Sequence, residues 1–389
     1  YISNIGYLSI GKGGGTRLDG SLNNISDFDI NGQSDIQNIY DDNTGYSFIH
    51  NPPLFVPTDP TIIQSISETE HAATNFIKAQ VNQHFWYGFL TTATYAKSDM
   101  LTFSGGLDFR SYKGEHYEEV YDLLGADYAI NSDNSNDPNV VSRVGDKISF
   151  HNDSYVRWGG VFAQMEYQTG LWSGFLNLSG ALSSFKRIDY FLPKIISGTL
   201  KTVGYGFNGV DPIPDTVSVN NQQYTPESEG LEFQESKWKT IPGFTVKGGA
   251  NYNMTDHMNV FLNIGYLSRT PRFRNVFDYS NKFYVEIKNE LIQAIELGFS
   301  YRRKNFASNL NGYYTNWVNR PVNNRIIKQF PDGERVVNIN GMDAIHMGME
   351  IDFAYKVNQK VTLEGVYSLG NWTWNSAKDS ITFKDEKGN

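Results

Sequence analysis

Hydrophobic and polar residues alternate along many segments of the chain. From Phe244, one set of alternate positions reads Phe, Val, Gly, Ala, Tyr, Met, and the other reads Thr, Lys, Gly, Asn, Asn. Similar alternation begins at Leu101 and at Ile345. Successive side chains of a β-strand point to opposite faces, so the pattern predicts strands with one apolar and one polar face. The runs exceed the roughly 5–6 residues of an ordinary globular strand and reach the about 9–11 residues that a tilted strand needs to cross a bilayer.

Short polar turns alternate with long polar connections. The long connections cover roughly residues 14–75, 113–152, 186–241, 271–290 and 321–342. The five short turns are Ser98–Asp99, Thr169–Gly170, Thr255–Asp256, Arg303–Lys304 and Asn358–Gln359. Outer-membrane barrels have short turns on the periplasmic side and long loops outside. The rhythm therefore predicts an all-β fold, an antiparallel up-and-down transmembrane β-barrel of about eleven strands. A soluble sandwich would alternate in the same way, but would not separate its connections so cleanly.

Composition narrows the choice further. The 389 residues exceed the roughly 250–300 at which a single soluble core stops growing, a limit that a lipid-facing barrel escapes. The absence of Cys excludes disulfides and thiolate metal sites. A net charge of −9 argues against nucleic acid as the main partner. No run of about 18 apolar residues offers a transmembrane helix.

Aromatic residues gather near the predicted strand ends. Rings at the level of the lipid headgroups form girdles around membrane barrels, whereas ordinary cross-strand aromatic pairs are the alternative. We expect girdles here. The residues concerned are Phe85, Trp86, Tyr87, Trp158, Trp172, Tyr313, Tyr314, Trp317, Trp372 and Trp374.

Several segments resemble the barrel of TonB-dependent receptors. Glu296–Leu297–Gly298–Phe299 resembles the family's strand before a tight turn, and Arg269–Thr270–Pro271 resembles its Arg-x-Pro motif near an external loop. His346–Asp352 looks like the next barrel strand. Two further segments, Gly11–Thr16 and Lys113–Tyr117, are similar to receptors of the Bacteroidetes branch.

The resemblance implies an outer-membrane receptor of a Gram-negative bacterium rather than an enzyme. Such a receptor imports a scarce nutrient, an iron chelate, a vitamin or an oligosaccharide, with energy relayed by TonB. Outer-membrane lipid and a surface lipoprotein are further expected partners, and no cofactor is expected. Eleven strands are half of the about 22 in such transporters, so we expect residues 1–389 to be part of one barrel domain, without the plug domain and the remaining strands. A passive porin and a secreted soluble β-rich carbohydrate-active enzyme are the alternatives.

Charged residues on the polar faces are the candidate ligand-binding residues. We expect them to face the lumen, where they contact a plug, line the substrate path or hydrate the wall. They are Arg110, Lys247, Glu296, Arg302, Glu350 and Asp352. The loop at 191–239, with Tyr205, Phe207, Tyr224 and Trp238, is the expected place of substrate capture.

Other chemistry is disfavoured. His116 lies among carboxylates, but its spacing matches no common metal site, and we read it as part of an exposed loop. Asn131–Asp137 lacks the Gly and Glu of an EF-hand. Gly11–Thr16 has its Lys before the glycines, unlike a P-loop, and we expect a strand end entering a loop. Glu350 and Asp352 share one strand face, which a barrel lumen requires without catalysis. We expect no catalytic and no metal site.

Overall fold

The computed structural model describes residues 1–20, 29–30, 33–44, 70–208, 211–278, 280–284, 287–321, 326–330, 333–337 and 341–375. Within these residues the regular secondary structure is almost entirely β-strand. No helix among them is long and apolar enough to cross a membrane.

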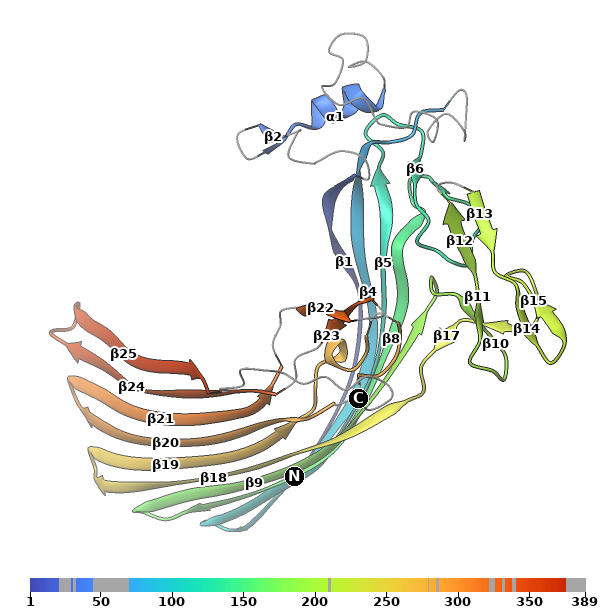
Figure 1. Ribbon diagram of the computed structural model, residues 1–389. Helices are drawn as coiled ribbons and strands as arrows, with labels where there is room; N and C mark the ends of the chain where they lie inside the picture. The colour runs from blue at the N-terminus through green and yellow to red at the C-terminus, as the bar shows by residue number, and fades with distance from the viewer. Residues whose placement is uncertain are drawn as a thin grey trace.

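One large antiparallel sheet dominates the molecule. Its eleven main strands are hydrogen-bonded in an order that follows the sequence, and a short strand, β17 (Gln234–Glu235), pairs with one of them, β9. The sheet bends into an open curve between its edge strands β1 and β25 (Figure 1). The predicted all-β architecture and strand number are confirmed. The main strands are β1 (Ile2–Gly20), β4 (Asn75–Ser98), β5 (Leu101–Asp122), β8 (Lys147–Gln168), β9 (Trp172–Asp189), β18 (Lys239–Thr255), β19 (Met258–Arg269), β20 (Glu290–Arg303), β21 (Phe306–Arg320), β24 (Met342–Lys356) and β25 (Thr362–Trp374).

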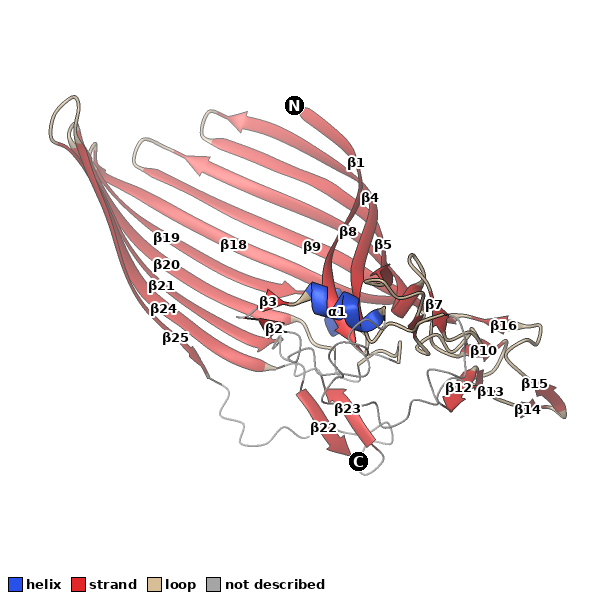
Figure 2. Ribbon diagram, turned by 90° about the horizontal axis from the view of Figure 1, so that it is seen from above, coloured by secondary structure: helices blue, strands red, loops and turns tan. Residues whose placement is uncertain are grey.

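The two ends of the sheet differ as the sequence predicts. All five predicted turns lie within a residue or two of the breaks between β4 and β5, β8 and β9, β18 and β19, β20 and β21, and β24 and β25. These turns share one end of the sheet, here called the turn end. Helix α1 and the small hairpins gather at the opposite end, the loop end (Figure 2).

The strands run further into the predicted long connections than the sequence indicates. Strand β1 continues to Gly20 and β5 to Asp122, so Gly11–Thr16 and His116 lie in strands and the expectation of loops there is wrong. Strand β4 has 24 residues, about 80 Å at roughly 3.3 Å per residue, against a hydrocarbon core of about 30 Å. Beyond the lipid a strand needs no continuous apolar face, and these continuations carry only scattered apolar residues such as Val81 and Val120.

The long connections contain small elements of their own. Helix α1 (Ile36–Asn43) begins where the Asp35 carboxylate accepts a hydrogen bond from the backbone N–H of Asn38. The buried Asn43 amide then donates to the carbonyl of Asn75 at 2.8 Å and of Leu123 at 3.0 Å, which fixes the helix on the loop end. The other elements are β2 (Asp29–Ile30), β3 (Gln33–Ser34), β6 (Ala129–Ile130), β7 (Val141–Ser142), β10 (Lys194–Ile196), β11 (Thr202–Val203), β12 (Tyr205–Asn208), β13 (Asp211–Pro214), β14 (Val217–Val219), β15 (Gln222–Tyr224), β16 (Leu231–Glu232), β22 (Ile326–Phe330), β23 (Gly333–Val337) and the 3-10 helix η2 (Phe273–Asn275).

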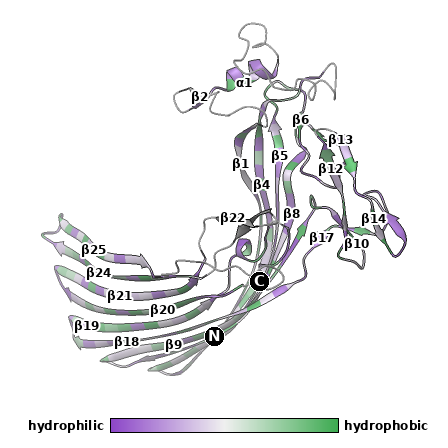
Figure 3. Ribbon diagram, viewed as in Figure 1, coloured by the Kyte–Doolittle hydropathy of each residue, from purple (hydrophilic) through white to green (hydrophobic). Residues whose placement is uncertain are grey.

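The two faces of the main sheet have opposite character. Hydropathy alternates along the strands (Figure 3). On β20, Ile295 and Leu297 are exposed, whereas Ala294 and Glu296 are half-buried. The same contrast holds on β9, β19 and β24. Side chains crowd on the inside of a curved sheet, so the half-buried polar set lies on the concave face and the exposed apolar set on the convex face. Soluble monomers rarely expose so continuous an apolar surface, which is typical of a lipid-facing belt.

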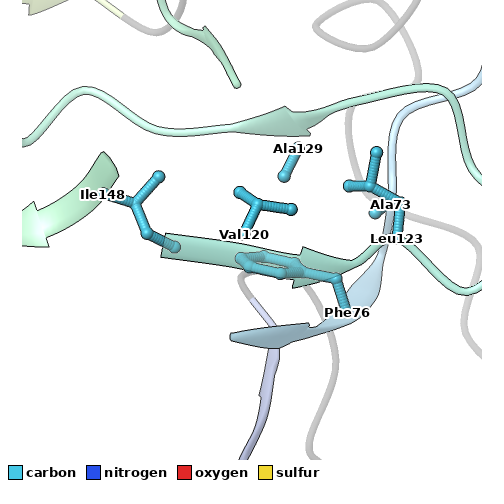
Figure 4. Close-up of a cluster of buried hydrophobic side chains, with 6 residues drawn as sticks. All are labelled: Ala73, Phe76, Val120, Leu123, Ala129 and Ile148. Carbon is cyan, nitrogen blue, oxygen red and sulfur yellow. The ribbon is translucent and has the colours of Figure 1, made fainter. Parts of the chain in front are cut away.

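A hydrophobic cluster holds the loop end together. Ala73, Phe76, Val120, Leu123, Ala129 and Ile148 are buried against one another, from β4, β5, β6, β8 and the segments beside them (Figure 4). Their convergence explains why the strands remain ordered beyond the belt, where lipid no longer supports them.

A buried ion network lies beside this cluster. The Lys78 ammonium is 2.9 Å from the Glu118 carboxylate, and the side chains are only 8% and 3% exposed. Arg17 reaches the same carboxylate at 2.8 Å, and Asp19 also pairs with Lys78. Buried charges need such partners because desolvation penalises each of them.

A second polar cluster makes the loop end sensitive to acid. The Lys147 ammonium lies 2.8 Å from the Glu115 carboxylate and 3.0 Å from Nε2 of His151, whose ring stacks on Tyr190 at 4.4 Å. Burial lowers the pKa of His151, and the hydrogen bond from Lys147 lowers the pKa of Glu115. Both groups therefore bind protons more readily when this region unfolds.

We expect acidification to loosen β5 and β8 at the loop end. Neutral His151 contributes its full stabilisation of the folded state above about pH 6.5, and this contribution is lost as the pH falls through its lowered pKa. The stabilisation from the Glu115 carboxylate is lost only at still lower pH. Amide-exchange protection factors for residues 113–122 should fall between about pH 7 and about pH 5. The variant His151→Phe should keep the ring stack and lose this step, and a step of unchanged size in that variant would contradict the assignment.

Candidate functional site: the concave wall

Polar side chains of neighbouring strands form a continuous wall on the concave face. Residues directly opposite each other in the ladder bring their side chains together across the strands. Asn263 donates to Glu296 at 3.2 Å, and Asn309 donates to Asp352 at 2.8 Å. Such cross-strand hydrogen bonds fix the positions of the polar groups that a solute would meet.

Three of the predicted lumen residues are carboxylates on this wall. Glu296 and Asp352 accept the hydrogen bonds just described, and Glu350 accepts one from the Ser368 hydroxyl at 3.3 Å. Each carboxylate has its own amide or hydroxyl partner. Among the described residues, no three His, Cys, Asp or Glu side chains gather as a metal site would require.

The predicted cations lie far apart on the same wall. Arg110 pairs with Asp108 at 2.6 Å, and its guanidinium lies 4.9 Å from the centre of the Trp158 ring. Lys247 lies opposite Gly265 in the middle of β18, and Arg302 lies at the turn end of β20. By alternation all six predicted residues lie on the concave face, but they do not converge into one site. Their role in binding stays a prediction.

A depression of about 620 Å³ lies near the turn end of the wall. Amides and a carboxylate line much of it: Gln164 receives a hydrogen bond from Asn177 at 3.1 Å and donates one to Glu166. The Phe261 ring lies in the lining because β20 has Gly298 beneath it, where a Cβ would come within 2.3 Å of the ring. The polar groups of the lining are mostly neutral amides and hydroxyls and lie beside two phenylalanine rings, so the depression suits another protein surface or a hydroxyl-rich solute.

Aromatic rings form a row on the wall toward the loop end. The ring centres of Trp317 and His346 are 5.9 Å apart, and those of His346 and Trp372 are 6.4 Å apart. Trp372 donates through Nε1 to the Tyr313 hydroxyl at 3.1 Å. The Arg320 guanidinium lies 4.8 Å from the centre of the Trp317 ring. The rings are tilted to one another, at 52° and 56°, and aromatic rings beside a cation can bind planar or sugar rings and anionic groups.

This row corrects part of the girdle interpretation. Tyr313, Trp317 and Trp372 lie on the concave face and not toward lipid, since Tyr313 lies directly opposite Glu296 and Trp372 directly opposite His346. Trp172 still fits a girdle, because it packs on Tyr252 of the apolar face at 4.4 Å. A signal for the row was present in the sequence: His346 lies at even spacing from Glu350, on the polar side of its strand.

The external loop at 191–239 does not deliver its aromatic residues to the wall. Trp238 stacks with the Arg157 guanidinium at 4.4 Å on the convex side, beyond the apolar belt. The Tyr205 hydroxyl donates to Glu227 within the loop.

His116 forms a hydrogen bond with Asn82 through Nδ1 at 2.7 Å, and its neighbour Glu115 accepts one from Lys147.

The segment at 131–137 is hydrogen-bonded to a neighbouring connection of the loop end. The Asn136 amide donates to the carbonyls of Tyr190 and Leu192 at 2.8 and 2.9 Å. A side chain of this oxygen-rich segment thus forms hydrogen bonds with the backbone of the loop end.

Comparison with known proteins gives one family. The sequence matches the family described as TonB dependent receptor-like, beta-barrel, over residues 3–389. A search of the curated proteins gave no match.

A search of the solved structures matches part of the chain to several transporters and receptors at low identity, three of which follow. The chain is 13% identical to the copper transporter OprC over 76% of its length and 39% of that chain, with a TM-score of 0.47. It is 14% identical to the ferric-catecholate import receptor Fiu from K12 E. coli over 81% of its length and 40% of that chain, with a TM-score of 0.45. It is 10% identical to the alcaligin receptor FauA from Bordetella pertussis over 79% of its length and 44% of that chain, with a TM-score of 0.40. The chain thus spans less than half the length of each of these structures.

Proposed function

The chain belongs to the TonB-dependent receptor family, and from this premise we propose that it forms part of the wall of an outer-membrane receptor that imports a scarce solute. The observation that carries the proposal is the separation of an exposed apolar face from a half-buried polar face across the curved sheet. The first face suits outer-membrane lipid and the second suits a lumen. The placement within the Bacteroidetes branch stays a prediction.

The proposed cycle depends on parts of the receptor beyond this sheet. In the complete protein, strands pairing with the edges β1 and β25 would close the barrel, since unpaired edges invite aggregation. A plug domain would rest against the amide-lined depression near the turn end and would meet TonB on the periplasmic side. The solute, an iron chelate, a vitamin or an oligosaccharide, would enter past the aromatic row. A surface lipoprotein is a further proposed partner.

Fractionation of the complete receptor tests the membrane part of this proposal. We expect recovery in the outer membrane and faster gel migration before boiling than after, as a closed barrel gives. Recovery as a soluble protein without detergent would overturn it and would favour a secreted enzyme.

Growth of the producing bacterium tests the energy-dependent part. A strain lacking the receptor should grow more slowly than its parent when iron, a corrinoid vitamin or one polysaccharide is limiting. Loss of TonB should remove the difference. Persistence of the parent's advantage without TonB would contradict active import and favour a passive porin.

A further inference from the structure

We propose that the loop end of β19, β20 and β21 holds a subsite for the anionic group of the imported solute, a carboxylate or phosphate. The inference rests on the proposed function, and it adds a substrate class that the fold alone does not give. The subsite is a cavity of about 100 Å³ on the concave side. Its lining includes Arg269, Arg272, Lys288, Glu290, Trp317 and Arg320.

Charge is the first argument for an anion. Three guanidinium groups, those of Arg269, Arg272 and Arg320, line the cavity beside the single carboxylate of Glu290, in a chain whose net charge is −9. Like charges so close together repel each other unless an anion lies between them. A bound carboxylate or phosphate would relieve that repulsion and accept hydrogen bonds from the guanidinium groups.

The internal carboxylate does not neutralise the cavity. Glu290 is 7% exposed, and its carboxylate lies 3.6 Å from the Arg269 guanidinium, too far for a hydrogen bond. Glu290 lies directly opposite Arg269 in the ladder. The register therefore holds Arg269 at the cavity and leaves donor capacity on its guanidinium.

Aromatic rings hold the second guanidinium in place. Arg320 lies 4.8 Å from the centre of the Trp317 ring and 5.8 Å from that of Trp374. Stacking on rings orients a guanidinium while its edge N–H groups stay available to an oxygen acceptor. Trp317 also begins the row that continues through His346 to Trp372. A solute with an anionic group in the cavity could therefore lay a ring along this row.

The position favours a solute over a lipid headgroup. Trp317 and Glu290 belong to the concave set by alternation along β21 and β20, away from the apolar belt. A cavity of about 100 Å³ also admits one small anionic group and not a whole ligand. We therefore assign it as an anchor point within a larger binding surface.

Titration of the purified complete receptor with citrate and inorganic phosphate tests the subsite, with maltose as the neutral probe. Binding is followed by calorimetry and by tryptophan fluorescence. We expect saturable binding of an anion, weakened about tenfold or more in Arg269→Gln and in Arg320→Gln, since each loses charge-assisted hydrogen bonds. The matched control, Arg303→Gln, removes the same charge from the opposite face of β20 and should bind as the unaltered receptor does.

A variant that strengthens binding separates this subsite from mere structural damage. Glu290→Gln keeps the side-chain shape and removes the competing negative charge, so anion affinity should rise several-fold. Heat-modifiable migration should show that every variant folds.

Several outcomes would overturn the subsite. They are the absence of saturable anion binding at millimolar concentration, equal binding of maltose, or unchanged anion affinity in both arginine variants. TonB-dependent growth together with any of these results would leave the import function standing. Anion binding at this subsite without TonB-dependent growth would instead overturn the import function alone.

Discussion

Replacing Lys78 with Met is expected to destabilise the loop end of β4 and β5 by about 3–5 kcal/mol, the usual cost of leaving one partner of a buried ion pair alone. The substitution removes one partner of the Glu118 carboxylate, whose side chain is 3% exposed. Glu118 pairs with two cations, Lys78 and Arg17, and Lys78 is the buried one. Arg17 remains at 2.8 Å, but its side chain is 62% exposed and its charge is well hydrated. The carboxylate would then lie buried with a partner that solvent screens.

Amide exchange of β4 and β5 in vesicles measures this effect residue by residue. The control Arg143→Ala breaks an exposed pair with Glu70 at the same end of the sheet and should cost within about 1 kcal/mol. The double variant Lys78→Met with Glu118→Leu should recover most of the loss, because apolar side chains can replace a buried pair at little cost. If the single and double variants are equally unstable, the loss comes from packing rather than from charge.

Replacing Leu297 with Arg is expected to destabilise the membrane-inserted barrel by about 2–4 kcal/mol. Leu297 is 62% exposed on the convex face of β20, with Ile295 beside it on that face and Leu262 opposite it in the ladder. It lies near the middle of the stretch that would cross the bilayer. A charge there must leave water for hydrocarbon, and the described residues next to it on that face include no acidic side chain.

Urea titration of the complete receptor in vesicles, read by heat-modifiable migration, measures the change. The matched control Ala294→Arg places the same side chain on the concave face of the same strand, where polar neighbours and water would accept it. We expect a small effect there. Similar losses for the two variants would contradict a lipid-facing convex side.

Local patterns account for what could be predicted. The turn at Thr255–Asp256 and the alternation from Phe244 depend on residues next to each other in the chain, and the structure has β18 and β19 meeting there. The eleven main strands follow from the same kind of information. The extension of β5 to Asp122 could not be read in this way. In that stretch no continuous apolar face marks a strand, and the order depends on distant partners: Val120 packs against Phe76 and Ile148, and Glu118 pairs with Arg17.

For the candidate site, too, one part follows from local patterns and another part only from the fold. The sequence by itself determined which side chains share the polar face, Glu296, Glu350 and Asp352 among them, because strand alternation is a local property. Only the tertiary structure decided which of them meet. Cross-strand register sets Trp317, His346 and Trp372 in a row, and it brings Arg269 and Arg320 to one cavity from positions about fifty residues apart. The register between two strands depends on the lengths of all the strands and turns that separate them in the chain. Hydrophobic periodicity therefore fixes the face of the sheet on which a residue lies, whereas its cross-strand neighbours are set only by the fold.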